Sequence, residues 1–309
     1  MYPLPIRTLI NTHSVGLNAL SAEEERFHFG MWAINKSPLI IGAALDPDRL
    51  SQTSLDIMSN KEVIAINQDS LAQQAQLVRR YTEEEWDIWL GNLSGSRQVL
   101  GLANWRNDSQ TINVNLASLG VASANARDVW AAADLGTVSG SQNISLAGHE
   151  LRLWVLSDIV TGPSPQPGAY YMAANASISG TAQTVLCTSG TCLPTGSKVG
   201  DIMANASVSF ANVSVQSGGK KALAIDFVNY DYAFETAWDW GDNARNMTIA
   251  VNGHDAKRWA FPLSGGNWEE SGRLQVEVEG FVEGSDNVVV IQAYGNSPAP
   301  DLVGFEVLE

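Results

Sequence analysis

Hydrophobic positions recur with helical spacing near the start of this chain. Ser21 and Glu24 form a capping box, which predicts that a helix begins at this point. The apolar residues that follow on one helical face are Phe27, Met31 and Ile34. Pro38 disfavours helical geometry at the residue before it, so we expect the helix to end at Ser37.

Residues 39–45 contain no polar side chain. A strand with one exposed face would alternate apolar and polar residues, whereas an unbroken apolar run suits a parallel strand covered on both faces. The segment therefore predicts a barrel or a doubly wound sheet. Helical spacing returns from Leu50 and is interrupted once, at residues 59–60.

Short alternating runs replace the helical spacing from residue 76 to about residue 158, and they predict the antiparallel strands of a β-sandwich. The clearest runs are residues 86–90, 111–116 and 151–155. Five tryptophans lie in this region: Trp86, Trp89, Trp105, Trp130 and Trp154. Sugar platforms are one interpretation of these rings, but alternating aromatic residues are ordinary in sandwich strands, so we expect them to pack in the core.

A proline-rich segment, residues 161–168 with the sequence TGPSPQPG, predicts an extended linker. Strand patterns resume after it at residues 204–215, 222–229, 248–251, 274–278, 287–292 and 305–308. The pattern therefore predicts a mostly β protein of three parts. A helix–strand–helix region at residues 1–75 is followed by a first sandwich at residues 76–160, and the linker separates that sandwich from a second one at residues 169–309.

Charge and composition exclude several classes of partner. The 309 residues include 18 Lys and Arg against 33 Asp and Glu, a formal net charge of −15. This charge repels nucleic acids and anionic membrane surfaces, and it is compatible with a neutral ligand such as a sugar. No apolar run approaches the roughly 18 residues of a membrane-spanning helix.

Cys187 and Cys192 are the two cysteines, and their spacing favours a disulfide that closes a tight loop. A zinc site would need further ligands nearby, yet the histidines are scattered at positions 13, 28, 149 and 254. Sequons for N-glycosylation occur at Asn92, Asn107, Asn143, Asn175, Asn205, Asn212 and Asn246. Together these features favour a secreted protein.

The first 20 residues contain no apolar run long enough for a signal peptide. The chain as written is therefore expected either to be cytoplasmic or to be the remainder of a longer, exported precursor. We favour the second interpretation, because the disulfide spacing and the sequons both suit the secretory pathway.

Three motifs carry a family resemblance: FGMWA at 29–33, KSPLIIG at 36–42 and SNKEVIAINQD at 59–69. They resemble the end of the catalytic barrel of fungal α-galactosidases, glycoside hydrolase family 27, and the similarity continues to residue 153. The resemblance implies that residues 1–75 are the end of a (β/α)8 barrel and that residues 76–160 are the sandwich that follows it. It also implies retaining hydrolysis of terminal α-galactosyl residues from oligosaccharides and galactomannan.

The same resemblance implies that the catalytic residues are two aspartates on the fourth and sixth barrel strands, the nucleophile in a Lys-Tyr-Asp segment. Both strands lie upstream of the matching part, so no residue here inherits either role and we expect no catalysis. Two aspartates of this chain are weighed as catalytic candidates. Asp231, in an Asn-Tyr-Asp segment that resembles the nucleophile segment in two letters, lies in the second sandwich and is not expected to be catalytic. Asp46 follows the predicted strand at the barrel face where active sites lie, but it has no partner carboxylate and is expected to be a helix or turn cap. His28 is expected to pack within its helix. A truncated or mis-spliced gene model is a further interpretation.

The second sandwich resembles carbohydrate-binding modules of families 6 and 35, through residues 173–180, 248–253, 287–290 and 300–305. In those families an early carboxylate strand and a late Asp hold calcium. Asp301 stands at the late position, but residues 171–174 contain no carboxylate, so we expect no cofactor.

Aromatic and acidic residues are densest in residues 227–240, FVNYDYAFETAWDW. Rings interleaved with carboxylates suit the C–H faces and hydroxyls of a sugar, although packing of a sandwich face is the other interpretation. The predicted saccharide-binding residues are Tyr230, Tyr232, Trp238, Asp239 and Trp240. The expected partner is a neutral, galactose-containing saccharide. Two function classes stay open: an α-galactosidase and a non-catalytic carbohydrate-binding protein.

Overall fold

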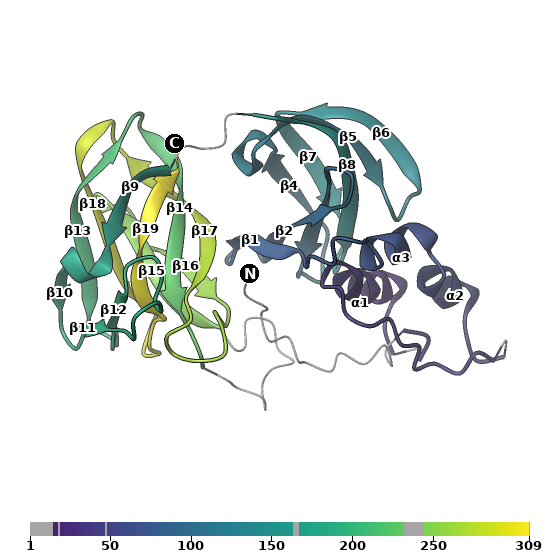
Figure 1. Ribbon diagram of the computed structural model, residues 1–309, viewed down its shortest axis with the longest axis horizontal. Coiled ribbons are helices and arrows are strands. Elements are labelled where there is room, and N and C mark those ends of the chain that lie inside the picture. Colours follow the sequence, from purple (N-terminus) through teal and green to yellow (C-terminus); the bar gives the residue numbers. More distant parts are fainter. Residues whose placement is uncertain (1–14, 18, 47, 163–166, 232–243, 309) are drawn as a thin grey trace. The chain divides into compact units, whose positions relative to one another are not determined.

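The computed structural model describes residues 15–17, 19–46, 48–162, 167–231 and 244–308 (Figure 1). These residues divide into two compact units. The helix–sandwich unit comprises residues 15–78 and 85–162, and the C-terminal unit comprises residues 79–84 and 167–308.

Three α-helices precede the first strand in the described part of the chain: α1 (Ala22–Ile34), α2 (Gln52–Met58) and α3 (Lys61–Asn67). The predicted capping box is confirmed, since the Ser21 hydroxyl accepts from the Glu24 N–H while the Glu24 carboxylate accepts from the Ser21 N–H. Helix α1 ends at Ile34, earlier than predicted. Asn60 caps α3 by accepting from two backbone N–H groups, which accounts for the predicted interruption.

The strand predicted at residues 39–45 is wrong. These residues have no regular secondary structure, and Ile40, Ile41 and Leu45 are 68%, 48% and 68% exposed. A buried parallel strand requires partner strands on both edges, and no described segment pairs with this one. The described part of the helix–sandwich unit therefore contains three helices before its first strand, but no strand at residues 39–45.

The predicted first sandwich is confirmed as antiparallel sheets. In this unit the strand order of the larger sheet is β1 (Gln76–Tyr81), β2 (Trp86–Leu93), β3 (Arg97–Asn104), β8 (Leu151–Thr161), β5 (Val121–Asp128) and β6 (Ala133–Ser139). The smaller sheet pairs β4 (Gln110–Asn115) with β7 (Ser141–Leu146). A short 3-10 helix, Ala117–Leu119, precedes β5.

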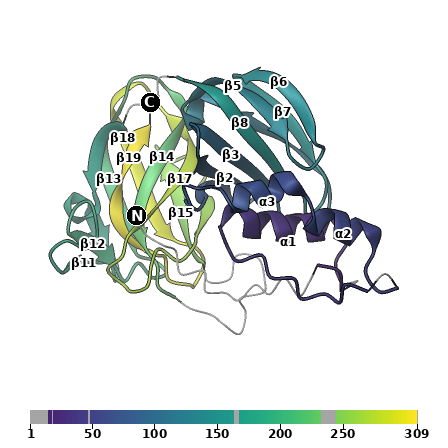
Figure 2. The ribbon, with the colours of Figure 1, turned by 45° about the vertical axis from the view of Figure 1, so that its right-hand side comes forward.

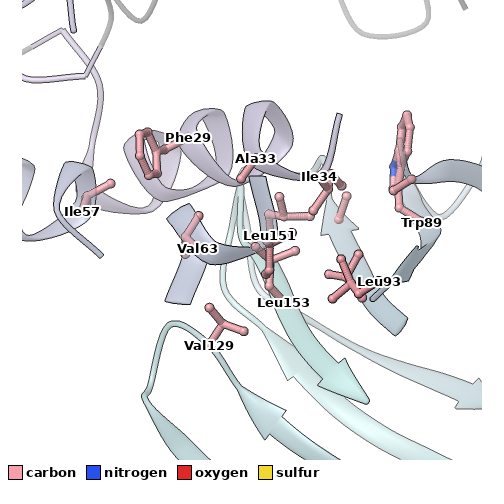
Figure 3. Close-up of a cluster of buried hydrophobic side chains, with 14 of the residues drawn as sticks. Phe29, Ala33, Ile34, Ile57, Val63, Trp89, Leu93, Val129, Leu151 and Leu153 are labelled. Atoms are coloured by element: carbon pink, nitrogen blue, oxygen red, sulfur yellow. The ribbon is translucent and has the colours of Figure 1, made fainter. Parts of the chain in front are cut away.

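The helices and the larger sheet share one hydrophobic core (Figure 3). Ala33 and Ile34 of α1 are fully buried against Leu151 and Leu153 of β8. A Cβ atom added to Gly30 would lie 2.8 Å from a methyl carbon of Leu151, so a larger residue would force the Leu151 side chain to move. The glycine of the FGMWA motif therefore allows the close packing of α1 on β8.

Core packing also accounts for most of the tryptophans in this unit. Trp86, Trp89 and Trp154 are at most 7% exposed, which confirms the packing interpretation for these three rings. Trp105 and Trp130 are partly buried and pack against the same core. The indole N–H of Trp105 donates to Asp87 at 2.9 Å, and its ring meets Phe27 edge-on.

Side-chain hydrogen bonds join the end of α3 and the residues after it to Ser37 and Ser94. The Asn67 side chain donates to the Ser37 carbonyl at 2.9 Å. The buried Asp69 carboxylate accepts from the Ser94 N–H at 2.9 Å and from the Ser94 hydroxyl at 2.7 Å. Burial raises the pKa of Asp69, but the hydrogen bonds from Ser94 and Leu71 outweigh that effect and lower it overall. The SNKEVIAINQD motif thus supplies structural contacts.

The C-terminal unit contains two antiparallel sheets, visible at the left of Figures 1 and 2. One has the order β11 (Gln183–Leu186), β12 (Ser197–Gly200), β19 (Asp301–Leu308), β14 (Gly219–Val228) and β17 (Gly272–Phe281), with β9 (Pro167–Met172) also paired to β19. The other has the order β10 (Ser177–Ser179), β13 (Ser207–Val215), β18 (Gly284–Ala293), β15 (Arg245–Val251) and β16 (Lys257–Phe261). A 3-10 helix, Ala173–Asn175, follows β9.

Every segment predicted as a strand in this region overlaps an observed strand, so the second sandwich is also confirmed as antiparallel β structure. The predicted linker is shorter than expected. Strand β8 continues to Thr161 and strand β9 begins at Pro167, while residues 163–166 lie outside the described residues.

Replacing Gly30 by Val should destabilise the helix–sandwich unit by about 1–3 kcal/mol, because the new methyl groups would overlap Leu151. Ala22→Val, at an exposed position of the same helix, serves as the control. The measurement is urea unfolding of both variants at constant m-value. Equal stability of the two variants would contradict the close approach of α1 to β8.

Amide hydrogen exchange should be fast in residues 39–45 and slow in β3, because the backbone of the first segment has a single described hydrogen bond, from the Ile40 N–H to the Pro38 carbonyl. The measurement is peptide-resolved exchange on a monodisperse monomer. Protection of residues 39–45 equal to that of β3 would show that the segment is paired, as the sequence predicted.

Candidate functional site

The predicted saccharide-binding residues are only partly within the described chain. Tyr230 is described and follows β14, whereas Tyr232, Trp238, Asp239 and Trp240 lie outside the described residues. The Tyr230 ring meets the ring of Trp268 edge-on, with 6.3 Å between centroids. The sequence pattern did not single out Trp268.

Trp268 lies in the loop between β16 and β17 and is 36% exposed. The guanidinium carbon of Arg245 lies 4.6 Å from the centroid of its ring, within the range of a cation–π contact. Arg245 also donates to the Asp231 carboxylate at 3.0 Å and to the Ala299 carbonyl at 3.2 Å. The two hydrogen bonds hold the Arg245 guanidinium in place, and the guanidinium contacts the Trp268 ring.

A lysine also holds the Trp268 loop. The Lys198 ammonium donates to the Trp268 carbonyl, pairs with Asp301 at 2.7 Å and lies 5.8 Å from the indole centroid. The Lys198 residue is 6% exposed. Burial raises the pKa of the Asp301 carboxyl, and the pull of Lys198 in the opposite direction only partly offsets it.

The predicted disulfide between Cys187 and Cys192 is confirmed, and its loop contacts the residue after Trp268. The Cys192 N–H donates to the Glu269 carbonyl at 2.8 Å. The Thr191 hydroxyl donates to the Glu269 carboxylate at 3.2 Å, and the Thr188 N–H donates to it at 3.3 Å. Hydrogen bonds from Thr188, followed by that from Thr191, lower the pKa of Glu269. The disulfide loop therefore buttresses the Trp268 loop.

The Asn229 side chain closes the cluster from the β14 side. The side-chain amide of Asn229 donates to the carbonyls of Phe261 and Pro262. The backbone N–H of Asn229 donates to the Ser264 hydroxyl at 2.9 Å. The start of the Trp268 loop is thus tied to the end of β14. The result is a partly exposed indole in contact with the paired cations Arg245 and Lys198, next to Glu269, which Thr188 and Thr191 bind.

Both carboxylates weighed as catalytic candidates have structural partners. Asp46 accepts from the Asp48 N–H at 3.0 Å and pairs with Arg49, the geometry of a turn cap. Asp231 pairs with Arg245. The two aspartates belong to different units.

His28 is half-buried beside Trp32, with 5.5 Å between ring centroids. Burial lowers its pKa, as expected for a packed histidine. Within the described ranges, no three His, Cys, Asp or Glu residues are placed to hold a metal ion. No helix in this part of the chain is long and apolar enough to cross a membrane.

Accessibility separates the predicted glycosylation acceptors. Six of them are exposed: Asn92, Asn107, Asn143, Asn175, Asn205 and Asn212. Asn246 is half-buried in β15, opposite Ala260 of β16, and its carbonyl oxygen is buried. Glycosylation stays a prediction at all seven, and Asn246 is the least accessible to a transferase.

Residues 83–156 match the family described as the α-galactosidase C-terminal β-sandwich domain. The match covers strands β2 to β7 and the first part of β8 in the helix–sandwich unit. It agrees with the sandwich that the resemblance implied for this region.

The whole chain is similar to longer proteins. A probable α-galactosidase D from Aspergillus flavus is 31% identical over 95% of this chain and 61% of its own length. This chain thus spans about three fifths of that relative. The aligned region runs over 403 positions, longer than the 309 residues here, so the relative also contains internal residues without a counterpart in this chain.

Two solved structures are similar over about half of the chain. α-Galactosidase I from Mortierella vinacea is 30% identical, with a TM-score of 0.44 and coverage of 48% of this chain and 39% of that protein. The α-galactosidase from Saccharomyces cerevisiae, in a structure with raffinose, is 25% identical, with a TM-score of 0.42 and coverage of 46% and 45%. Over most of its length, this chain is similar to proteins named α-galactosidase D from Aspergillus species, and its residues 83–156 match the α-galactosidase C-terminal β-sandwich domain.

Proposed function

We propose that this chain belongs to a protein that acts on terminal α-galactosyl residues, and that the residues present here bind a neutral saccharide rather than cleave it. The observation that carries the proposal is the partly exposed indole of Trp268, held by Arg245 and Lys198. The relatives named as α-galactosidase D support the substrate class.

The cluster around Trp268 suits a sugar for two reasons. An indole face offers apolar contact to the C–H groups of a pyranose ring, and the threonine hydroxyls and carboxylates nearby offer hydrogen-bond partners to its hydroxyls. A fixed ring also loses little conformational freedom when a ligand binds.

Charge pairing favours a neutral sugar over an acidic one. Arg245 is paired with Asp231, and Lys198 is paired with Asp301. Neither cation is left with an uncompensated charge for a ligand carboxylate, and the whole chain is strongly acidic. A galactose-containing oligosaccharide is the proposed ligand.

Several features support binding without hydrolysis. A retaining glycosidase needs two carboxyl groups about 5–5.5 Å apart. The sequence contains no Lys-Tyr-Asp segment, and both carboxylates weighed for the role are engaged by arginines. The disulfide and the six exposed acceptor asparagines support the further proposal that the protein is secreted and glycosylated.

The purified chain should release no p-nitrophenol from p-nitrophenyl α-galactoside above the buffer rate, because a covalent route requires a nucleophile and an acid together. The assay compares wild type with Asp46→Asn. Turnover that survives repurification and is lost in Asp46→Asn would show that a catalytic site is present.

Trp268→Ala should weaken binding of a galactose-containing oligosaccharide by more than about 1 kcal/mol, or roughly fivefold or more, because it removes an interface anchor. Tyr294→Ala removes another exposed ring of the same unit, which is 47% exposed, and should leave binding unchanged. The measurement is calorimetric titration of the full chain with galactose, galactomannan fragments and xylan fragments.

Trp238→Ala and Trp240→Ala test the alternative site that the sequence predicted. If these variants lose binding while Trp268→Ala retains it, the site lies in residues 232–243. If the wild type binds none of the three saccharides, the C-terminal unit is a structural domain and the proposal of saccharide binding is wrong.

A further inference from the structure

In the carbohydrate-binding modules that the C-terminal unit resembles, calcium is held between an early strand and a late strand, which correspond here to β9 and β19. Strand β9 pairs with β19, with Met172 opposite Gly304, so the early and late strands lie together as a shared ion site would require. Strand β9 nevertheless contributes Tyr170, Tyr171 and Met172, none of which is a carboxylate. Asp301 of β19 is the acidic residue at the late position.

Asp301 already has a cationic partner. The Lys198 ammonium lies 2.7 Å from one of its carboxylate oxygens, and both side chains are largely buried, at 8% and 14% exposed. Arg245 adds further positive charge close to Asp301. A divalent cation at this carboxylate would face the repulsion of both side chains. Calcium takes about six to eight oxygen ligands, and in the described part of the chain Asp301 belongs to no group of three acidic, histidine or cysteine side chains that could hold a metal ion. These residues do not fit a calcium site.

The contacts of Lys198 extend beyond charge neutralisation. Its ammonium bonds the carbonyl of Trp268 and lies against the indole of the same residue. The next residue, Glu269, receives the hydrogen bonds of the disulfide loop. One ammonium group therefore joins the start of β19 to the loop that carries Trp268, and the disulfide loop joins the same loop from its other side.

We infer that Lys198 takes the place of a bound metal ion in this unit and positions Trp268, so that the site is metal-independent. The consequence for sugar binding rests on the proposed function, whereas the positioning of the loop does not. Lys198 is a positioning residue, because it acts through Trp268 and Asp301.

Lys198→Met tests this inference in the full chain, with Lys220→Met as the control at a lysine whose side chain is 53% exposed. Amides of residues 264–271 should exchange about tenfold faster or more in Lys198→Met, because a buried hydrogen bond to a charged group is lost. Exchange in Lys220→Met should match the wild type. Unchanged exchange of residues 264–271 in Lys198→Met would overturn the inference.

The single variant leaves Asp301 as an uncompensated buried charge, which can unfold the unit by itself. The double variant Lys198→Met/Asp301→Leu removes both charges and should restore the Tm of the unit without restoring protection of residues 264–271. Loop protection that returned with the Tm would show that Lys198 acts only as half of an ion pair.

Calcium binding is the measurement that tests whether the site is metal-independent. Titration of the wild-type chain with calcium chloride alone should give no saturable heat, and the Tm should be equal in calcium chloride and in EDTA. Saturable uptake, or a Tm raised by calcium, would overturn the inference. If wild type binds no saccharide while the exchange and calcium results are as expected, the proposed function is wrong and the role of Lys198 stands.

Discussion

The close approach of α1 to β8 is the constraint on which the helix–sandwich unit depends. Helices α2 and α3 are each one to two turns long, too short to be stable in isolation. They persist because α1 fixes a core that they complete with Ile57 and Val63 (Figure 3). The absence of a side chain at Gly30 lets that core form at van der Waals distance from Leu151.

Local patterns in the sequence predicted local structure correctly. They failed where the predicted structure depends on neighbouring strands, as at residues 39–45. The capping box at Ser21 and the cap at Asn60 are decided within one helical turn, so the sequence suffices for them. Strand alternation likewise identified both sandwiches. Residues 39–45 have the composition of a buried strand, but whether they form one depends on neighbouring strands that the composition of the segment cannot supply.

The candidate site was predicted only in part, for a comparable physical reason. The dense aromatic run at residues 227–240 includes Tyr230, whose ring contacts Trp268. Trp268 lies alone in the sequence GGNWEE, where no periodicity marks it. Its importance arises from contacts with Arg245 and Lys198 that are distant in sequence. A lone tryptophan in a polar, glycine-rich loop was the only available signal.

The motif at residues 59–69 and the candidate site around Trp268 differ in what their contacts do. The motif at residues 59–69 makes structural contacts, since Asn67 and Asp69 tie α3 to the end of α1 and to the β2–β3 hairpin. Hydrogen bonding and packing are sufficient roles for these residues, whether or not a catalytic pair accompanies them. A partly exposed ring held by two paired cations has no comparable packing role, because an indole left open to solvent contributes less to stability than a buried one. The motif at residues 59–69 is thus explained by its structural contacts, whereas Trp268 keeps a partly exposed ring that core packing does not explain.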